Sequence, residues 1–429
     1  MKYPKYSAYK DSQAEWLERV PEHWDAPLLK YVARLKYGDS LAANERDKSG
    51  NVLVYGSNGE VGVHSSANTK APAIIVGRKG SYGKVTFTAE AAFSIDTTYF
   101  IDSTCTNHHL RWLYYALQPA GLDTNSQDTG VPGLSREAAY STRFVAPSYS
   151  EQVTIAAFLD IEIAKIDKLI DKQERLITLL QEKRQALISH VVTKGLNPNV
   201  SMKDSGVEWF GKIPGDWHVD RLKWTAEGCN NGIWGEEADG GENDIICIRV
   251  ADFDRQKFTV NLSDPTFRLV TQSQRASREL KQGDLLLEKS GGGEKQPVGV
   301  VVIYDHPEPA VCSNFVAKMV IRPEYNSRYI CYVHTMLYSK RVNTRSIKQN
   351  TGIQNLDSSA YLDEKFPIPS LIEQNTIATF LDTETTQIDM LSEKARKVID
   401  RLTERRIALI SAVVTGKIDV RIFANGNPP

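Results

Sequence analysis

The sequence has few of the features that mark secreted, metal-binding or membrane proteins. Its five cysteines include no CxxC pair, so neither a zinc site nor a disulfide framework is expected. It has no run of about 18 uncharged apolar residues, which excludes a membrane-spanning helix. The opening residues, MKYPKYSAYKDSQ, lack the apolar core of a signal peptide. We therefore expect a cytoplasmic protein with no membrane partner.

An excess of positive charge is also missing. The net charge of the 429 residues is −1, whereas a protein that binds DNA alone and without sequence preference is usually basic. Either this chain does not bind DNA, or local patches bind it with the help of a partner.

Signatures of catalysis are absent as well. The segment GRKGSYGK at residues 77–84 lacks the first glycine and the Ser or Thr of a P-loop, and GSNGEVG at residues 56–62 is not a dinucleotide fingerprint. No HExxH zinc motif and no GxSxG elbow occur, and the Asn-Pro-Pro-aromatic motif of adenine methyltransferases is missing. We expect no catalytic residue, no metal ligand and no cofactor bound by this chain.

The most ordered pattern in the sequence is a long amphipathic stretch, residues 147–195. Apolar residues recur there in alternating steps of three and four, which predicts a helix that presents one stripe to a partner helix, as in a coiled coil. Ser148 and Glu151 predict a capping box at its start, and Gly195 predicts its end. At about 1.5 Å per residue the helix would be about 65–70 Å long.

The same stretch returns at residues 369–417. Both copies begin Pro-Ser-x-x-Glu-Gln-x-Thr-Ile-Ala-x-Phe-Leu-Asp and end Ala-Leu-Ile-Ser-x-Val-Val-Thr. Two such helices would pack antiparallel through one seam. The predicted seam consists of Ile155, Leu159, Ile166, Ile170, Ile177, Leu180 and Leu187 in the first helix, and Ile377, Leu381, Ile388, Ile399, Leu402 and Leu409 in the second.

The repeat extends beyond the helices. KDSQAEW before Pro21 and Trp24 returns as KDSGVEW before Pro214 and Trp217, and a Thr-Gly-[Val/Ile]-x-x-Leu motif precedes each long helix. The repeating unit is therefore a tryptophan segment, a globular block and a long helix. We expect domains at residues 1–147 and 197–368, helical spacers at 148–196 and 369–422, and a tail at 423–429.

Both globular blocks alternate short strand patterns with glycine turns. Strands are expected at residues 52–55, 73–76, 85–88 and 98–101 in the first block, and at 245–250, 285–287, 298–304 and 317–321 in the second. A short helix is expected near residues 109–117 and again near 329–339. The expected fold class is α+β: two similar mixed α/β domains, related by a pseudo-two-fold axis and separated by an antiparallel coiled coil.

The glycine loops and the segments before each long helix carry polar and basic side chains. Glycine lets a backbone approach a phosphate closely, and Arg, Lys, Asn and Gln hydrogen-bond to base edges, although such residues also occur in ordinary solvated turns. The candidate DNA-binding residues are Ser57, Asn58, Arg78, Lys79, Ser81, Lys84, Gln127 and Thr129 in the first block, and Lys289, Ser290, Lys295, Asn314, Arg345, Lys348, Gln349 and Asn350 in the second.

Taken together, the duplicated KDS-x-x-EW segment, the duplicated PS-x-x-EQ-x-TIA-x-FLD helix entrance and the ALIS-x-VVT helix ends closely resemble the DNA specificity subunit of type I restriction-modification enzymes. The GSNG and GRKGS-x-GKV loops with IDTT at residues 95–98 also resemble one common type of target-recognition domain in that family. The second block departs from it: SGGGEKQP stands in place of GSNG.

The resemblance implies two target-recognition domains, each reading one half of a bipartite double-stranded DNA site in a prokaryotic cell. The helices would set the spacer between the halves and dock two modification (methyltransferase) subunits, and two restriction (motor-nuclease) subunits would join them. S-adenosylmethionine, ATP and Mg²⁺ would bind to those partners. Two alternatives stay open: a coiled-coil adaptor with no nucleic-acid role, and the DNA reader of a related defence system with a different effector.

Overall fold

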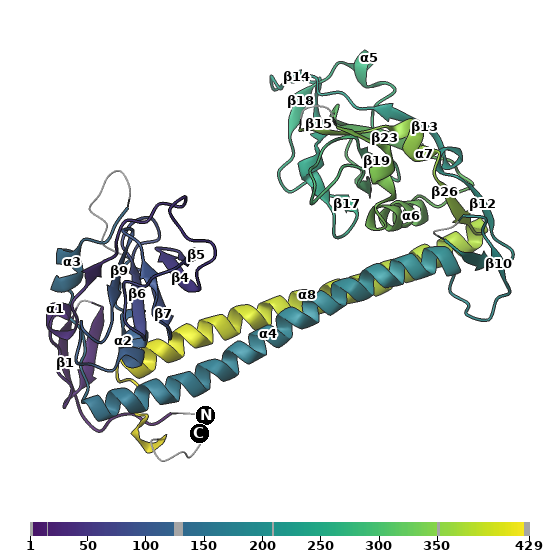
Figure 1. The fold of residues 1–429 in the computed structure, drawn as a ribbon. Coiled ribbons are helices and arrows are strands. Elements are labelled where there is room, and N and C mark those ends of the chain that lie inside the picture. The colour runs from purple at the N-terminus through teal and green to yellow at the C-terminus, as the bar shows by residue number, and fades with distance from the viewer. Residues whose placement is uncertain (1–2, 15, 124–131, 208–209, 350–351, 424–429) are drawn as a thin grey trace. The chain divides into compact units, whose positions relative to one another are not determined.

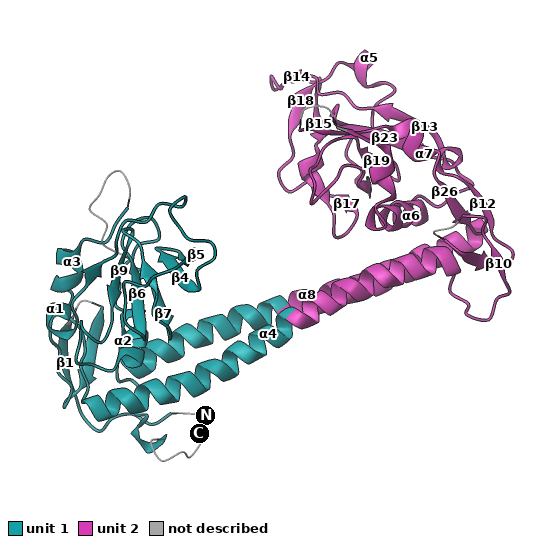
Figure 2. Ribbon diagram, in the orientation of Figure 1, with its two compact units in different colours: residues 1–174, 396–429 teal, residues 175–395 magenta. Residues whose placement is uncertain are grey.

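Two compact units make up the chain in a computed structural model that describes residues 3–14, 16–123, 132–207, 210–349 and 352–423 (Figure 1). The first unit comprises residues 1–174 and 396–429, and the second comprises residues 175–395 (Figure 2). Each of the two long helices therefore contributes one part to each unit. Both units combine helices with small, mostly antiparallel sheets, which is the mixed α/β architecture expected from the sequence.

The first unit begins with a hairpin and a short helix, which are followed by a series of short strands, two further short helices and a long helix. Its strands are β1 Tyr9–Ala14, β2 Leu17–Pro21, β3 Lys36–Tyr37, β4 Val52–Gly56, β5 Gly59–His64, β6 Ala73–Gly77, β7 Val85–Thr88, β8 Phe93–Ser94 and β9 Thr98–Ile101. Its short helices are α1 Leu29–Val32, α2 Leu110–Leu117 and α3 Arg136–Ser141, and the long helix α4 spans Tyr149–Lys194.

The sheets of the first unit are small and pack around two core clusters. Strands β3, β9, β6 and β7 form an antiparallel sheet in that order, and β5, β4 and β8 form a second one in which β4 and β8 are parallel. Helix α2 lies against β6 and β7 and buries Trp112 fully. Trp24 of the tryptophan segment is also fully buried in the same cluster, together with Leu159 of α4.

The second unit has more strands. They are β10 Met202–Asp204, β11 Lys212–Pro214, β12 His218–Arg221, β13 Ala226–Asn231, β14 Glu236–Glu237, β15 Asp244–Ile248, β16 Phe253–Asp254, β17 Thr259–Val260, β18 Phe267–Leu269, β19 Leu285–Glu288, β20 Ser290–Gly291, β21 Val301–Ile303, β22 Ala310–Cys312, β23 Val316–Ile321, β24 Ile347–Gln349, β25 Gln354–Leu356 and β26 Lys365–Ile368. Its α-helices are α5 Gln272–Arg275, α6 Ser327–Ser339, α7 Ser358–Leu362 and the long α8 Leu371–Val414.

A six-stranded sheet, in the order β13-β23-β19-β21-β17-β16, organises the second unit. Helix α6 packs on it through contacts with β21, and Trp217 of the second tryptophan segment is buried in the same core. The strand expected at residues 298–304 is shorter than predicted, because only residues 301–303 pair in the sheet. The strand expected at residues 245–250 ends at Ile248, where a 3-10 turn over Val250–Asp252 begins.

The two long helices run antiparallel within each unit. In the first unit Asp167 of α4 pairs with Arg406 of α8 at 3.3 Å, and residues nearer the start of α4 share a core with residues nearer the end of α8. In the second unit Arg184 pairs with Asp389 at 3.2 Å. Most of the predicted seam is buried; the partly buried members are Ile170, Ile177, Leu187, Ile399 and Leu402.

The predicted capping box at the start of α4 is only half formed. The Ser148 hydroxyl accepts the Glu151 amide at 3.4 Å, as expected. The Glu151 carboxylate, however, accepts hydrogen bonds from the Tyr6 hydroxyl at 2.6 Å and from His23 Nε2 at 3.1 Å. The capping-box prediction was therefore wrong for Glu151, because the tertiary contact with the N-terminal segment recruits its carboxylate.

Each long helix ends at a glycine that packs against a tryptophan segment. Gly195 has φ +74° and lies against Trp217, and Gly416 has φ +73° and lies against Pro21 and Trp24. A left-handed residue stops a helix, and glycine adopts that conformation without strain. The second tryptophan segment thus covers the end of α4, and the first covers the end of α8.

Over the described ranges, no helix is both long enough and apolar enough to cross a membrane. The same residues contain no cluster of three or more His, Cys, Asp or Glu side chains that could hold a metal ion.

Candidate nucleic-acid interface

The structure brings the predicted residues of the first block together at two adjoining turns. Ser57 and Asn58 occupy the turn between β4 and β5, and residues 78–84 connect β6 to β7. The Lys84 ammonium donates to the Asn58 carbonyl at 2.7 Å and to its side-chain oxygen at 3.0 Å, which ties the two turns to each other. Lys79 and Ser81 are exposed beside them.

Arg78 is the half-buried member of this group. Its guanidinium lies 5.2 Å from the centre of the Tyr37 ring, on which Arg136 also lies at 4.9 Å. Two cations on one exposed aromatic ring form a positively charged surface next to the glycine turns. This surface suits the phosphates or guanine edges of DNA.

In the second block, Lys289 and Ser290 follow β19, and Lys295 is exposed in the same glycine loop. The Lys289 ammonium donates to the Asn231 side-chain oxygen at 2.6 Å, and the Ser290 hydroxyl donates to Asn355 at 2.6 Å. Asn314 is exposed in the turn that joins β22 to β23. This turn lies beside the start of the loop, because the Lys289 amide donates to the Phe315 carbonyl at 2.8 Å.

The remaining candidates of the second block lie nearer the long helix. Lys348 pairs with Asp357 at 2.8 Å, and Arg345 lies 3.9 Å from Glu364, so each cation already has an acidic neighbour. Gln127, Thr129, Asn350 and the side chain of Gln349 fall outside the described residues.

The two glycine loops have equivalent backbone contacts although their sequences differ. In the first unit the Arg78 amide donates to the Thr97 carbonyl at 2.8 Å, and the Arg78 carbonyl accepts the Leu134 amide at 2.8 Å. In the second unit Lys289 makes the same two contacts, with the Phe315 carbonyl and the Leu356 amide, both at 2.8 Å. Arg78 and Lys289 are therefore equivalent positions of one duplicated loop.

A second duplicated contact joins each globular block to a long helix. Asp160 of α4 accepts from Arg111 Nε at 2.7 Å and from the Tyr115 hydroxyl at 2.6 Å. Asp382 of α8 accepts from Arg328 Nε at 2.7 Å and from the Tyr332 hydroxyl at 2.6 Å. We call each of these two groups an Asp–Arg–Tyr lock.

Electrostatics favour both locks. Burial raises the pKa of Tyr115 and of Tyr332, and the smaller effect of the hydrogen bond to the aspartate acts in the same direction, so both phenols stay protonated and donate. The sequence analysis missed the arginine and tyrosine. Their signal was present, because Arg-x-x-x-Tyr occurs on the short helix of both blocks and places the two side chains on one face.

Gln152 and Gln374 form a further matched pair at the helix entrances. The side-chain oxygen of Gln152 accepts the His109 amide at 2.9 Å, and its nitrogen donates to the Pro147 carbonyl at 2.8 Å. Gln374 accepts the Asn326 amide at 3.0 Å and donates to the Pro369 carbonyl at 3.0 Å. The duplicated glutamine of the sequence therefore anchors the start of α2 and of α6 to a long helix.

The chain is similar in sequence to known proteins over most of its length. The chain is 23% identical over 316 residues to the type I restriction enzyme MjaVIII specificity subunit of Methanocaldococcus jannaschii, which covers 72% of this chain and 70% of that protein. It is 21% identical over 355 residues to the type I restriction enzyme EcoBI specificity subunit of Escherichia coli, and this match covers 80% of this chain and 73% of that protein.

A solved chain, described in work on complex assembly and conformational transition of the type I R-M system, superposes with a TM-score of 0.66. It is 13% identical in sequence, and the match covers 93% of this chain and 99% of that one. No family model matches. In sequence the chain is similar to specificity subunits of type I restriction enzymes, and in fold it is similar to a chain of a type I R-M system.

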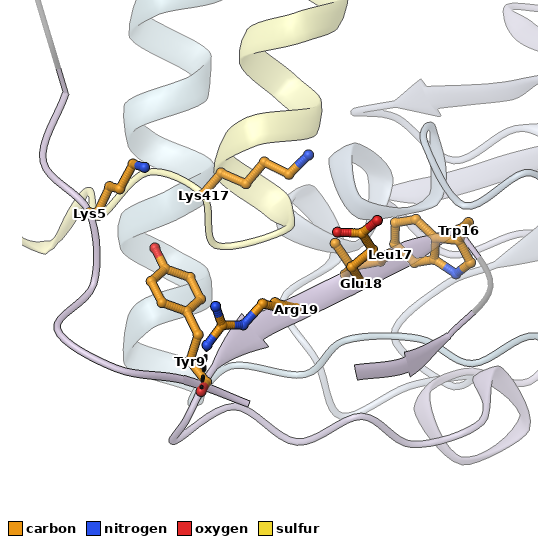
Figure 3. A pocket seen from close by; sticks show the side chains of 7 residues that line it. All are labelled: Lys5, Tyr9, Trp16, Leu17, Glu18, Arg19 and Lys417. Carbon is orange, nitrogen blue, oxygen red and sulfur yellow. Dashed lines mark hydrogen bonds between the residues drawn. The ribbon is translucent and has the colours of Figure 1, made fainter. Parts of the chain in front are cut away.

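Each of the two units has a hollow in its surface. Figure 3 shows the one in the first unit, of about 760 Å³, between the β1–β2 hairpin and the turn after α8. Lys5, Arg19 and Lys417 line it together with Tyr9 and Trp16. Among the residues that the structure describes, no predicted DNA-binding residue lines this hollow.

The second hollow, of about 580 Å³, lies in the second unit, and Ser290 and Asn314 both line it. Trp234 and Phe315 border it with 39% and 49% of their surface exposed. The sequence analysis did not single out these two aromatic residues. For Phe315 the available signal in the sequence was its position directly after the candidate residue Asn314.

Proposed function

We propose that this chain is the DNA sequence-specificity subunit of a type I restriction-modification system and that each globular block reads one half of a bipartite target. The observation that carries this proposal is the duplication of a complete reading unit: a glycine loop with a basic residue at the same backbone position, Arg78 or Lys289, held to a long helix by an Asp–Arg–Tyr lock. Different side chains on equivalent loops suit two different half-sites.

The proposed domains are residues 1–147 and 197–368, and the proposed spacers are the helices over residues 148–196 and 369–422. The DNA contacts proposed are the polar and basic residues of the two loops. The helices would determine the number of unspecified base pairs between the half-sites.

Adenine methylation would be performed by modification subunits bound to the helices. Outside the seam, α4 carries exposed apolar side chains, with Leu169, Leu176 and Leu179 each at least 42% exposed, and α8 carries Met390 and Leu391, each 50% exposed. Apolar residues on two sides of a helix favour packing against a second partner. We propose that helices of two modification subunits cover these residues, and that two restriction subunits join through them.

The proposal is tested by long-read methylation mapping in cells that express this chain with its methyltransferase. We expect N6-methyladenine in a split motif, and methylation confined to short unsplit sites would contradict the proposal. Exchange of residues 1–147 for those of a relative should change one half-site only. Insertion of four residues in the middle of α4, which adds about 6 Å, should lengthen the spacer and leave both half-sites unchanged.

The adaptor alternative makes a different prediction for the same complex. If the glycine loops had no role in DNA binding, charge reversal at Arg78, Lys79 and Lys295 would leave retention of DNA unchanged. We expect those substitutions to abolish retention. As a control, reversal at Lys48, which is exposed elsewhere in the first block, should have a small effect.

A further inference from the structure

The hollow in the second unit has the composition of a binding site for a planar ring. Trp234, Phe315 and Ile353 border it and are 39%, 49% and 54% exposed. Large apolar side chains gathered around a concave surface leave a patch that is stabilised when a ligand covers it. Tryptophan and phenylalanine rings are also the side chains on which nucleobases stack.

A polar group inside the hollow lacks a partner. Ser313 is 2% exposed, and its hydroxyl has no hydrogen-bond partner among the described residues. Its backbone is fixed, because its amide donates to the Ile248 carbonyl at 2.9 Å and its carbonyl accepts the Val316 amide at 3.0 Å. A buried hydroxyl without a partner is unfavourable, so this position favours a ligand with a polar edge.

Two further polar side chains line the same space. Arg249 pairs with Asp252 through Nη2 at 2.6 Å and Nε at 3.2 Å, and the remaining N–H groups of a guanidinium are donors. The exposed amide of Asn314 offers both a donor and an acceptor. The lining therefore combines stacking surfaces with groups that match the hydrogen-bonding edge of a base.

The volume distinguishes between two ways of reading DNA. A base that stays paired presents only its edge in the groove, and contact with it needs no cavity. The hollow is open to solvent, and its volume of about 580 Å³ is large enough to admit a whole small ligand. Ile95 occupies the position of Ser313 in the first unit. Its carbonyl accepts the Thr98 amide at 2.9 Å, as the Ser313 carbonyl accepts the Val316 amide.

We propose that this hollow receives one nucleobase of the half-site read by the second unit, turned out of the duplex stack. The inference rests on the proposed function, since Ser290 and Asn314 belong to the DNA-reading surface. The base would stack on Trp234 or Phe315, and its polar edge would be matched by Ser313, Asn314 and Arg249. No bond is made or broken.

A mismatch scan of the half-site tests this proposal with the complete complex of this chain and its methyltransferase. At each position only the base of the opposite strand is changed, and the dissociation constant of the duplex is measured. Positions read in the groove should lose about tenfold or more in affinity. At the extruded position a mismatch removes part of the energy of unpairing, so binding should become about tenfold tighter.

The variants Trp234→Ala and Ser313→Ala assign that position to the hollow. Both should abolish the tightening by the mismatch, while Phe267→Ala, which removes an aromatic residue of the same unit that is 50% exposed and does not line the hollow, should keep it. Ser313→Ala removes a hydroxyl without a partner, so it should not lower the thermal stability of the chain. If Trp234→Ala fails to fold, Ser313→Ala alone decides.

Two outcomes would overturn the inference. In the first, every mismatch weakens binding. In the second, the tightening survives both variants, which would place the extruded base on the methyltransferase. Either result is compatible with specific binding of the matched duplex, whereas loss of sequence preference in the unmodified complex would instead refute the proposed function.

Discussion

Leucine-to-alanine substitutions on α4 separate packing within this chain from docking of a partner. Leu159 is fully buried in the core of the first unit, whereas Leu169, farther along the same helix, is 46% exposed. The same three carbons are removed in both variants, and both residues remain good helix formers. Any difference in stability therefore reports the surroundings of the side chain.

The expected magnitudes differ several-fold. Leu159→Ala loses about 2.4 kcal/mol of transfer free energy for three buried carbons, and the cavity left behind raises the total to about 3–4 kcal/mol. Leu169→Ala leaves no enclosed cavity and removes a side chain that is half in solvent already, so the free energy of unfolding should fall by about 1 kcal/mol or less. Leu381→Ala, at the matching position of α8, should resemble Leu159→Ala, since Leu381 is also fully buried.

Urea unfolding of the full chain, followed by circular dichroism at the helix band, measures these losses. Co-purification with the modification subunit gives a second readout, in which Leu169→Ala should bind less well although its fold is intact. Equal losses of stability in Leu159→Ala and Leu169→Ala would refute the seam. Unchanged co-purification of Leu169→Ala would argue against partner helices on this face.

Four other expectations concern titration, backbone conformation, the lock and the seam. Burial lowers the pKa of His334 from 6.5 to about 3. As the pH drops below about 6.5, the unfolded chain therefore takes up a proton that the folded chain does not, and the free energy of unfolding falls. His334→Gln should reduce this dependence on pH by up to about 1.4 kcal/mol per pH unit, as measured by urea unfolding. Gly416→Ala should destabilise the folded chain more than Gly206→Ala, because both glycines have positive φ but only Gly416 faces Pro21. Equal urea midpoints of the two variants would contradict this expectation. Asp160→Asn should lower the free energy of unfolding by only about 1 kcal/mol, since Asp160 is 43% exposed. In methylation maps the same variant should methylate sites with more than one spacer length. A map identical to that of the unmodified chain would exclude a positioning role for Asp160. The double variant Ile166→Asp and Ile388→Asp should not co-purify with the modification subunits, because each substitution places a charge in the buried seam.

The sequence by itself determined the architecture of this protein. Heptad-like spacing over residues 147–195 and its return at 369–417 predict two helices that share a seam, because a stripe repeated over so many turns has few other ways to be buried. The glycine loops were also placed correctly, since glycine and β-branched residues mark turns and strands locally. Local rules were wrong at Glu151, whose carboxylate binds Tyr6 and His23 in place of the helix start.

The tertiary structure alone decided which distant groups meet. Arg111 and Tyr115 form a lock with Asp160, from a separate helix, through a contact that no local pattern specifies. Arg78 and Lys289 are equivalent only in their backbone partners, because the loops have different side chains. The hollow at Ser313 likewise exists only where five separate segments of the chain converge. Periodicity is a local property that can be read along the sequence. Hydrogen-bond partners and cavities depend on how distant segments of the chain pack together.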